Sequence, residues 1–395
     1  MSYGFLIGLL IHGSLALLSV AAPRRPRALA GLGYRVATVY NELPSLFVIL
    51  LLAFSFEQIS DGSLFGPDER ANLALLLIVL ALFVVIGVIG ARARPAVRTA
   101  LNEGLGAGWR DRVSPDLAEG LKEETPLANI LLFPFVLRPR DVRKVANVQY
   151  GDAGRRNLLD VYHHSSRPTG APVLAYFHPG GYYSGRKSVE ARALLFRLAG
   201  RGWVTISANY RLRPEANFFD HMVDMKKVIA WVREHAHEYG ADPSTLFLAG
   251  GSAGGHMASI AALTPNDERY QPDFESADTS VTAVASFYGW YGGYYGMGGA
   301  DSEFGPLGHD PSSAPPFFIA HGENDTLAHV ETARRFAAHL RATSPSPVVY
   351  AELPKGQHNF DLFHSFRSAA VVDGFEAFAA WVRSNRGSAG PSAQG

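Results

Sequence analysis

The chain has 395 residues, of which 47% are hydrophobic and only 18% are charged, so it can bury a large core. Its 36 basic residues balance 36 acidic ones, which removes any overall electrostatic case for a nucleic-acid or polyanion binder. No cysteine occurs, which excludes structural disulfides, cysteine-ligated zinc and a thiol nucleophile.

Three apolar segments lie within residues 1–92. Residues 3–20 and 71–90 are almost wholly apolar and match the roughly 20 residues with which a helix crosses a bilayer. Residues 43–56 are apolar but shorter, so we expect a third span there, with a buried core helix as the alternative. No basic residue precedes the first segment, which favours a retained anchor over a cleaved signal peptide. The sequence thus predicts a membrane region with two or three transmembrane helices.

Charged residues between the segments suggest an orientation. Basic residues follow the first and last segments: Arg24, Arg25, Arg27, Arg35, Arg92, Arg94 and Arg98. Acidic residues crowd the loop before the last segment: Glu57, Asp61, Asp68 and Glu69. Because basic loops face the cytoplasm, three spans place the amino terminus outside and everything after residue 91 inside. We therefore expect a multi-pass membrane protein with a cytoplasmic carboxyl-terminal domain.

Residues 93–145 are expected to form a linker plus a cap, since they are polar and five prolines break up any long helix. Their apolar piece, residues 127–137, has two readings that the sequence leaves open. It packs over an active site, or it lies on the membrane surface.

Residues 146–386 alternate short apolar runs with helical stretches. The runs are residues 172–177, 204–210, 246–250, 281–288, 316–320 and 348–353. This alternation predicts a mostly parallel sheet, and the continuous apolarity of the runs predicts helices on both faces, such as residues 224–235 and 369–383. Residues 387–395, rich in Ser and Gly, are expected to be a disordered tail.

A G-x-S-x-G motif places Ser252 directly after one apolar run and before a helix-compatible stretch. Such a nucleophile elbow exposes the serine hydroxyl at the top of an α/β-hydrolase sheet. A G-x-S-x-G motif also arises by chance in Gly-rich loops, so the presence of an acid and a base decides whether Ser252 is a nucleophile.

The expected partners follow in the order acid, then base. Asp325 lies on the loop after the run 316–320, and His358 lies on the loop after the next run. Glu323 is the rival acid, and a helix cap is the alternative role for Asp325. Serine needs a base for its proton and the base needs an acid to fix its tautomer, so the sequence predicts the catalytic set Ser252, Asp325 and His358.

Backbone amides that would stabilise an oxyanion are expected in two places. The run 172–177 leads into His178-Pro179-Gly180-Gly181, whose two glycines can bring their N–H groups close to a substrate. The third amide is that of Ala253, directly after the nucleophile. An ordinary glycine turn is the alternative reading of the first loop.

No cofactor is expected. The pairs His163-His164 and Asp220-His221 lack the spacing of a closed metal site, because adjacent residues on a strand point to opposite faces. The glycine loop also lacks the Lys and Ser/Thr of a phosphate-binding loop.

Together, these motifs resemble the hormone-sensitive-lipase-like group of α/β-hydrolase carboxylesterases, in particular actinobacterial lipases and esterases with an amino-terminal membrane region. The resemblance rests on the oxyanion loop, the run from Asn209 to Glu215, the serine motif, Asp325 and His358. It implies an α/β-hydrolase fold after an all-α transmembrane region, and hydrolysis of carboxylic esters through an acyl-serine intermediate.

Two residues depart from that group, which usually has H-G-G-G and G-D-S-A-G. Pro179 replaces a glycine that does not donate in the group, so function should survive. Gly251 removes a carboxylate beside the nucleophile but none of the three catalytic roles.

The expected substrate is a small-molecule or lipid-like ester. Candidate contacts, with aromatic packing as the alternative, are Tyr182, Tyr183, Tyr288, Trp290 and Tyr291. The rival functions are an arylformamidase-type amidase, a membrane acyltransferase using the same acyl-enzyme, and a catalytically dead adaptor, which would need a broken triad.

Overall fold

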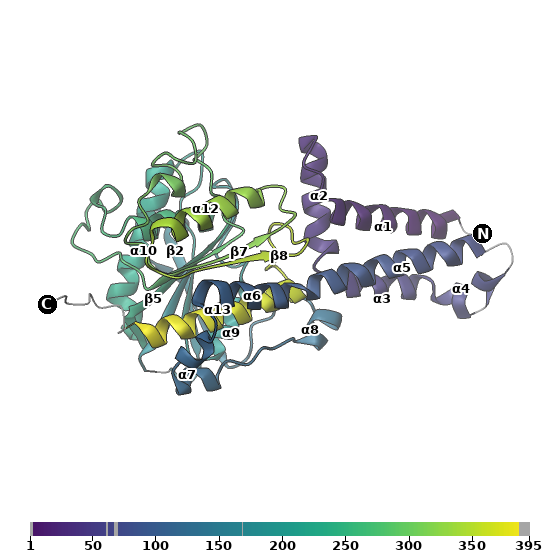
Figure 1. Cartoon of the computed structure of the whole chain (residues 1–395), viewed down its shortest axis with the longest axis horizontal. Helices are drawn as coiled ribbons and strands as arrows, with labels where there is room; N and C mark the ends of the chain where they lie inside the picture. The colour runs from purple at the N-terminus through teal and green to yellow at the C-terminus, as the bar shows by residue number, and fades with distance from the viewer. Residues whose placement is uncertain (1–2, 61, 67–69, 168, 387–395) are drawn as a thin grey trace.

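The computed structural model describes residues 3–60, 62–66, 70–167 and 169–386. The expected tail and three of the acidic loop residues, Asp61, Asp68 and Glu69, lie outside this range. The described chain has two parts, a layered α/β domain and a set of helices that projects from one end of it (Figure 1).

An eight-stranded sheet forms the centre of the α/β domain. In spatial order its strands are β1 (Val142–Gln149), β2 (Leu158–His164), β4 (Val204–Ala208), β3 (Ala171–Phe177), β5 (Ala241–Gly251), β6 (Ala283–Phe287), β7 (Phe317–Gly322) and β8 (Val348–Leu353). The six neighbours β4, β3, β5, β6, β7 and β8 pair in parallel, which confirms the predicted mostly parallel sheet. The antiparallel β1 and β2 are additions, since their runs are interrupted by polar residues.

Helices cover both faces of the sheet, as its continuous apolar strands require. One core joins the sheet to α10 (Phe218–His235), α11 (Ala253–Leu263) and α12 (Val330–Thr343). The other core joins the opposite face to α6 (Ala93–Leu105), α9 (Arg192–Gly200) and α13 (Phe366–Asn385). Single-turn 3-10 helices are η1 (Ser63–Phe65), η3 (Trp109–Arg112), η4 (Gly154–Asn157), η5 (Ala236–Tyr239), η6 (Glu268–Tyr270) and η7 (Pro306–Gly308).

The amino-terminal helices are α1 (Tyr3–Ala21), α2 (Arg27–Tyr40), α3 (Pro44–Phe54), α4 (Phe56–Ser60) and α5 (Arg70–Ala91). Helices α1 and α3 pack against α5, and all three point away from the sheet (Figure 1). In the described chain, α1 and the rod of α5 and α6 are long and apolar enough to cross a membrane. Helices α2 and α3 meet at an 80° bend and count together as at most one further span.

The break between α2 and α3 is held against the α/β domain by a buried ion pair. Glu42, in the break, forms an ion pair of 3.1 Å with Arg367 at the start of α13, and both side chains are buried. Arg367 also donates to the carbonyl of Asn41 at 3.0 Å. A buried charge needs a partner, so this pair fixes the bend against the α/β domain. Helix α2 stands across α1 and α5 instead of running in line with α3 (Figure 1).

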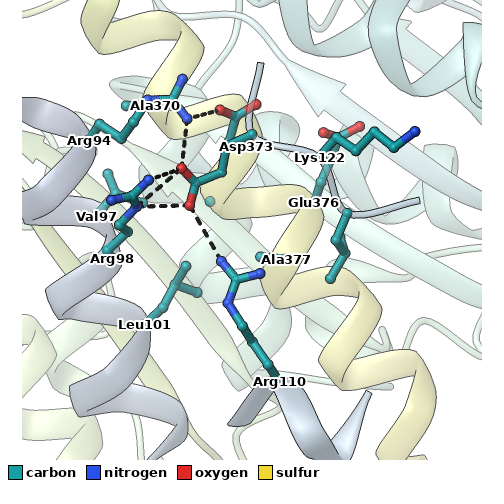
Figure 2. A pocket seen from close by; sticks show the side chains of 13 residues that line it. Arg94, Val97, Arg98, Leu101, Arg110, Lys122, Ala370, Asp373, Glu376 and Ala377 are labelled. Atoms are coloured by element: carbon teal, nitrogen blue, oxygen red, sulfur yellow. Dashed lines mark hydrogen bonds and ion pairs between the residues drawn. The ribbon is translucent and has the colours of Figure 1, made fainter. Parts of the chain in front are cut away.

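The segment 93–145, expected as linker plus cap, lies mostly beside the sheet. Helix α6 continues from α5 and packs on β8 and α13, and α7 (Pro115–Glu119) and α8 (Leu127–Leu132) follow it. Ion pairs fasten this segment: Arg94 of α6 pairs with Asp373 of α13 at 2.6 Å (Figure 2). Arg94, Arg98 and Arg110 all pair with Glu123. Arg94 and Arg98, which follow the last apolar segment, therefore form ion pairs within the α/β domain.

Candidate active site

Ser252 lies at a sharp turn between β5 and α11. Its backbone has φ 51° and ψ −113°, a strained conformation for a residue with a side chain, and strain of this kind clusters at active sites. A Cβ on Gly254 would lie 2.1 Å from the carbonyl oxygen of Phe177, so only glycine allows the helix to start this close to β3. The predicted elbow has the geometry that exposes a nucleophile.

Asp325 and His358 come together from the loops after β7 and β8. His358 Nδ1 lies 2.6 Å from Asp325 Oδ2, and both side chains are almost completely buried. The other carboxylate oxygen accepts the backbone N–H groups of Leu327 and Ala328 at 2.9 and 2.8 Å. These bonds fix the carboxylate toward His358, which leaves Nε2 of the imidazole for a second partner.

The charge of Asp325 is stabilised in place. Burial acts to raise the pKa of Asp325, but the charge of His358 and the hydrogen bonds from His321 and His358 outweigh it, and the pKa lies well below its usual value. His321 Nε2 lies 3.4 Å from Asp325 Oδ2, the oxygen that faces His358, and 2.6 Å from the carbonyl oxygen of Ala328. His321 therefore braces the acid loop.

The rival acid faces elsewhere. Glu323 accepts the backbone N–H of Lys355 at 2.9 Å, so its carboxylate holds the loop after β8. It carries no described contact with His358.

Ser252 and His358 line one cavity of about 900 Å³, which lies at the carboxyl ends of the parallel strands. Gly180, Gly181 and Ala253, the expected oxyanion donors, line the same cavity. Open α/β sheets bind ligands at this edge. The sequence-predicted groups thus meet in one place.

The glycine loop after β3 has an unusual backbone. Gly180, Gly181 and Tyr182 have φ values of 126°, 58° and 67°, so three successive residues lie in a region that side chains disfavour. The phenol of Tyr182 lies 2.5 Å from His256 Nδ1, and this bond ties the loop to α11. Burial lowers the pKa of His256 to about 4, so the imidazole is neutral at physiological pH.

Ala253 is the first residue of α11, where the backbone N–H has no acceptor within the helix. The amino end of a helix also carries partial positive charge. Gly180, Gly181 and Ala253 line the same cavity as Ser252, so their backbone amides remain the candidates for binding an oxyanion.

The five aromatic candidates for substrate contact fall into three groups. Tyr182 and Trp290 line the cavity. Tyr183 is half exposed and lies outside the lining residues. Tyr288 and Tyr291 are fully buried. Their hydroxyls are bonded inside the core, since Tyr288 donates to Asp361 and Tyr291 donates to Ser286. For these two the packing alternative holds.

Helix α2 supplies a wall of the cavity that sequence reasoning missed. Tyr34, on α2, lines the cavity, and its ring lies 6.0 Å from that of His358 in an edge-on arrangement. Helix α2 is tied to the acid loop by Thr326, which donates to the carbonyl of Ala30 at 3.4 Å. Helix α1 is tied to the same loop by Asn324, which donates to the carbonyl of Val20 at 2.9 Å. Among the described residues that line the cavity, Tyr34 comes from α2 and none comes from residues 93–145.

Other lining residues outside the prediction are Tyr294, Tyr295 and Glu190. Burial, aided by the charge of Asp361, raises the pKa of Glu190 to about 8. Only the amphipathic pattern of residues 27–40 would have pointed to α2, and no sequence signal pointed to Glu190.

Metal-binding geometry is not found: no cluster of three or more His, Asp or Glu side chains suited to a metal ion occurs in the part of the chain that the structure describes. His221, which the sequence pairs with Asp220, forms a hydrogen bond of 2.9 Å with the Tyr294 hydroxyl.

Comparison with known proteins finds ester hydrolases that are similar in sequence or in fold. The BD-FAE family matches residues 159–292. The "Probable carboxylic ester hydrolase LipM" of Mycobacterium tuberculosis is 38% identical over 327 residues, covering 74% of each chain. The "Esterase LipQ" of the same organism is 35% identical over 321 residues, covering 75% of this chain and 76% of the relative. A solved carbohydrate esterase from gut microbiota is similar in fold, with a TM-score of 0.54 and 20% identity over 62% of this chain and 99% of that one.

Proposed function

Because the chain belongs to the family of carboxylic ester hydrolases represented by these mycobacterial relatives, we propose that it is a membrane-anchored serine esterase that works through an acyl-serine intermediate. The chain is thus a carboxylic ester hydrolase of the α/β-hydrolase fold. The observation that carries the proposed mechanism is the buried contact of 2.6 Å between His358 Nδ1 and Asp325 Oδ2, beside the strained Ser252.

In the proposed first half-reaction, Ser252 Oγ attacks the ester carbonyl carbon while His358 Nε2 accepts the hydroxyl proton. Asp325 holds the imidazole in the required tautomer and stabilises the imidazolium. The amides of Gly180, Gly181 and Ala253 bind the oxyanion. As the intermediate collapses, the carbon–oxygen bond of the ester breaks, and His358 returns its proton to the leaving alcohol.

In the second half-reaction, water replaces the alcohol. His358 accepts a proton from water, which attacks the acyl carbon, and the bond to Ser252 Oγ breaks as that oxygen regains a proton. The products are a carboxylic acid and the free enzyme, and no metal or cofactor takes part.

A fluorophosphonate probe tests the nucleophile. We expect it to label the wild-type protein in detergent and to leave Ser252→Ala unlabelled. Ser184→Ala is a matched control, since Ser184 lines the same cavity and should not alter labelling. Equal labelling of wild type and Ser252→Ala, or none of either, contradicts the assignment.

Substrate class is tested separately. We expect turnover of p-nitrophenyl esters and little turnover of N-formylkynurenine, which an arylformamidase would prefer. Acyl transfer to an added alcohol in preference to water would instead indicate an acyltransferase.

For the membrane region, we propose that the three segments span the bilayer with the amino terminus outside and the α/β domain in the cytoplasm. In support, α1 and α5 both end at the domain, so Arg24, Arg25 and Arg92 lie at that end of the molecule (Figure 1). Protease added to intact cells should leave the carboxyl terminus uncut, and early cleavage would contradict this orientation.

A further inference from the structure

Residues 127–137 carry an unpartnered apolar surface outside the catalytic cavity. Their inner side is fixed: Ile130 and Val136 are buried, Ser45 donates to the carbonyl of Ile130 at 3.0 Å, and His364 donates its backbone N–H to that of Pro134 at 2.8 Å. Their outer side presents large apolar side chains that are 40–80% exposed, namely Leu127, Leu131, Leu132, Phe133, Phe135 and Leu137. This segment is therefore a firmly seated element with an apolar outer face.

The position of this face suggests what covers it. None of its residues lines the catalytic cavity, so it is not a cap. Helix α8 instead packs on α3, whose own Leu50 and Leu52 are about half exposed, so the two apolar surfaces are continuous. Figure 1 places α8 and α2 at the same level along the long axis, where the apolar helices meet the α/β domain.

Helix α2 lies between the catalytic cavity and the level at which the apolar helices meet the α/β domain. Tyr34 faces the cavity, whereas Leu29 and Leu32 are 37% and 48% exposed. Helices of this kind lie in the membrane interface with their apolar face buried in the acyl boundary. Beyond residues 127–137, the exposed Arg138 and Arg140 suit anionic headgroups.

We propose that residues 127–137 insert into the headgroup layer of the bilayer and, with α2, seat the catalytic cavity at the membrane surface, so that the enzyme takes amphipathic esters resident in the bilayer. This inference rests on the proposed membrane anchoring. Lipid covers the apolar face in this proposal, because the face continues that of the proposed spans.

The absence of cysteine provides a clean test, since each introduced cysteine is a unique labelling site. Nitroxide is attached to Phe133→Cys, to Ile78→Cys in α5, and to the exposed Lys122→Cys as the aqueous control. The proteins are reconstituted in vesicles of phosphatidylcholine and phosphatidylglycerol. Collision rates with oxygen, which concentrates in lipid, and with a water-soluble nickel chelate then report depth.

We expect position 133 to be shallow in the bilayer, position 78 deep and position 122 aqueous. Position 78 deep with position 133 aqueous overturns this inference and leaves the anchoring intact. Positions 78 and 133 both aqueous overturn the anchoring as well. A label at position 133 that neither reagent reaches indicates a covering protein partner, which also overturns it.

Activity gives an independent readout. The double variant Leu131→Ser/Leu132→Ser should keep wild-type turnover of soluble p-nitrophenyl butyrate but lose roughly tenfold on a long-chain ester carried in vesicles, because interfacial binding scales with buried apolar area. Phe219→Ser, an exposed apolar residue on α10, is the matched control and should lose neither. Equal losses on both substrates, or no loss on vesicles, overturn the proposal. Absence of soluble activity in the wild type contradicts the esterase assignment alone.

Discussion

The phenol of Tyr288 occupies the space that any side chain at position 251 would need. A Cβ on Gly251 would lie 2.6 Å from the Tyr288 hydroxyl. That hydroxyl is buried and donates to Asp361 at 2.7 Å, and the ring lies 4.7 Å from that of His358. Gly251, which departs from the aspartate usual in the resembling group, is therefore matched to the tyrosine that packs against His358.

Gly251→Asp should consequently lower the thermal midpoint of unfolding in detergent, since overpacking a filled core costs about 1–3 kcal/mol. The variant should also turn over esters more slowly, because Tyr288 packs against His358. Gly251→Asp/Tyr288→Ala restores the space and should recover part of the stability. A single variant as stable as wild type would show that this steric account is wrong.

Asp325→Asn should reduce kcat by about four orders of magnitude while leaving the fold intact, because the neutral amide no longer holds the histidine tautomer that serine needs. Glu323→Gln is the matched control on the same loop. Its carboxylate binds the backbone of Lys355, so kcat should stay close to wild type. Steady-state kinetics on p-nitrophenyl butyrate decide between the two acids, and the reverse pattern would assign the role to Glu323.

Glu190→Gln should extend activity to higher pH. Burial, aided by Asp361, raises the pKa of Glu190 to about 8, so this side chain is protonated at pH 7 and ionises as the pH rises through about 8. The new charge lines the same cavity as Ser252 and opposes a developing oxyanion. We expect the alkaline fall in kcat/KM near that pH to weaken in the variant, whereas the exposed Glu215→Gln should keep the wild-type profile.

The same group makes stability depend on pH. The pKa of Glu190 is higher in the folded state than in the unfolded state. The stability that protonated Glu190 contributes is therefore complete below the unfolded pKa and is lost as the pH rises to about 8. Wild type should thus lose stability relative to Glu190→Gln between about pH 4 and 8. A difference in thermal midpoint that does not change with pH would contradict the assignment.

Tyr34→Ala should alter substrate preference more than the chemical step, since Tyr34 is a wall of the cavity and takes no part in the proposed proton transfers. We expect KM to change with acyl-chain length while kcat on the smallest ester changes less than about tenfold. Leu32→Ala, on the exposed side of the same helix, is the control and should leave the preference unchanged. A loss of kcat that is equal for all chain lengths would instead indicate a disturbed triad.

Local pattern was sufficient for much of the site. The elbow at Ser252 needs small neighbours and a strand before it, and the loops bearing Asp325 and His358 each follow a buried strand, so parallel pairing alone brings their ends to one edge. The serine, acid, base and glycine loop could be named from the sequence because each is a short motif beside a recognisable strand.

Contacts between distant segments could not be predicted in this way. The sequence showed residues 27–40 only as a stretch between the first two apolar segments, yet Tyr34 in this stretch lines the cavity. The buried ion pair between Glu42 and Arg367 holds the end of α2 against the α/β domain. Tyr288 looked like a substrate contact, but its hydroxyl meets Asp361, which lies 73 residues away in the chain.

By itself, the sequence determined the fold class, the esterase motif set and the apolar segments, because strand periodicity, turn chemistry and helix hydropathy are local properties. Only the tertiary structure decided that a helix of the amino-terminal region walls the cavity, that Glu190 lines it too, and that α8 packs beside α3. Those outcomes depend on which buried charges find partners and which surfaces meet, and both are set by packing across hundreds of residues.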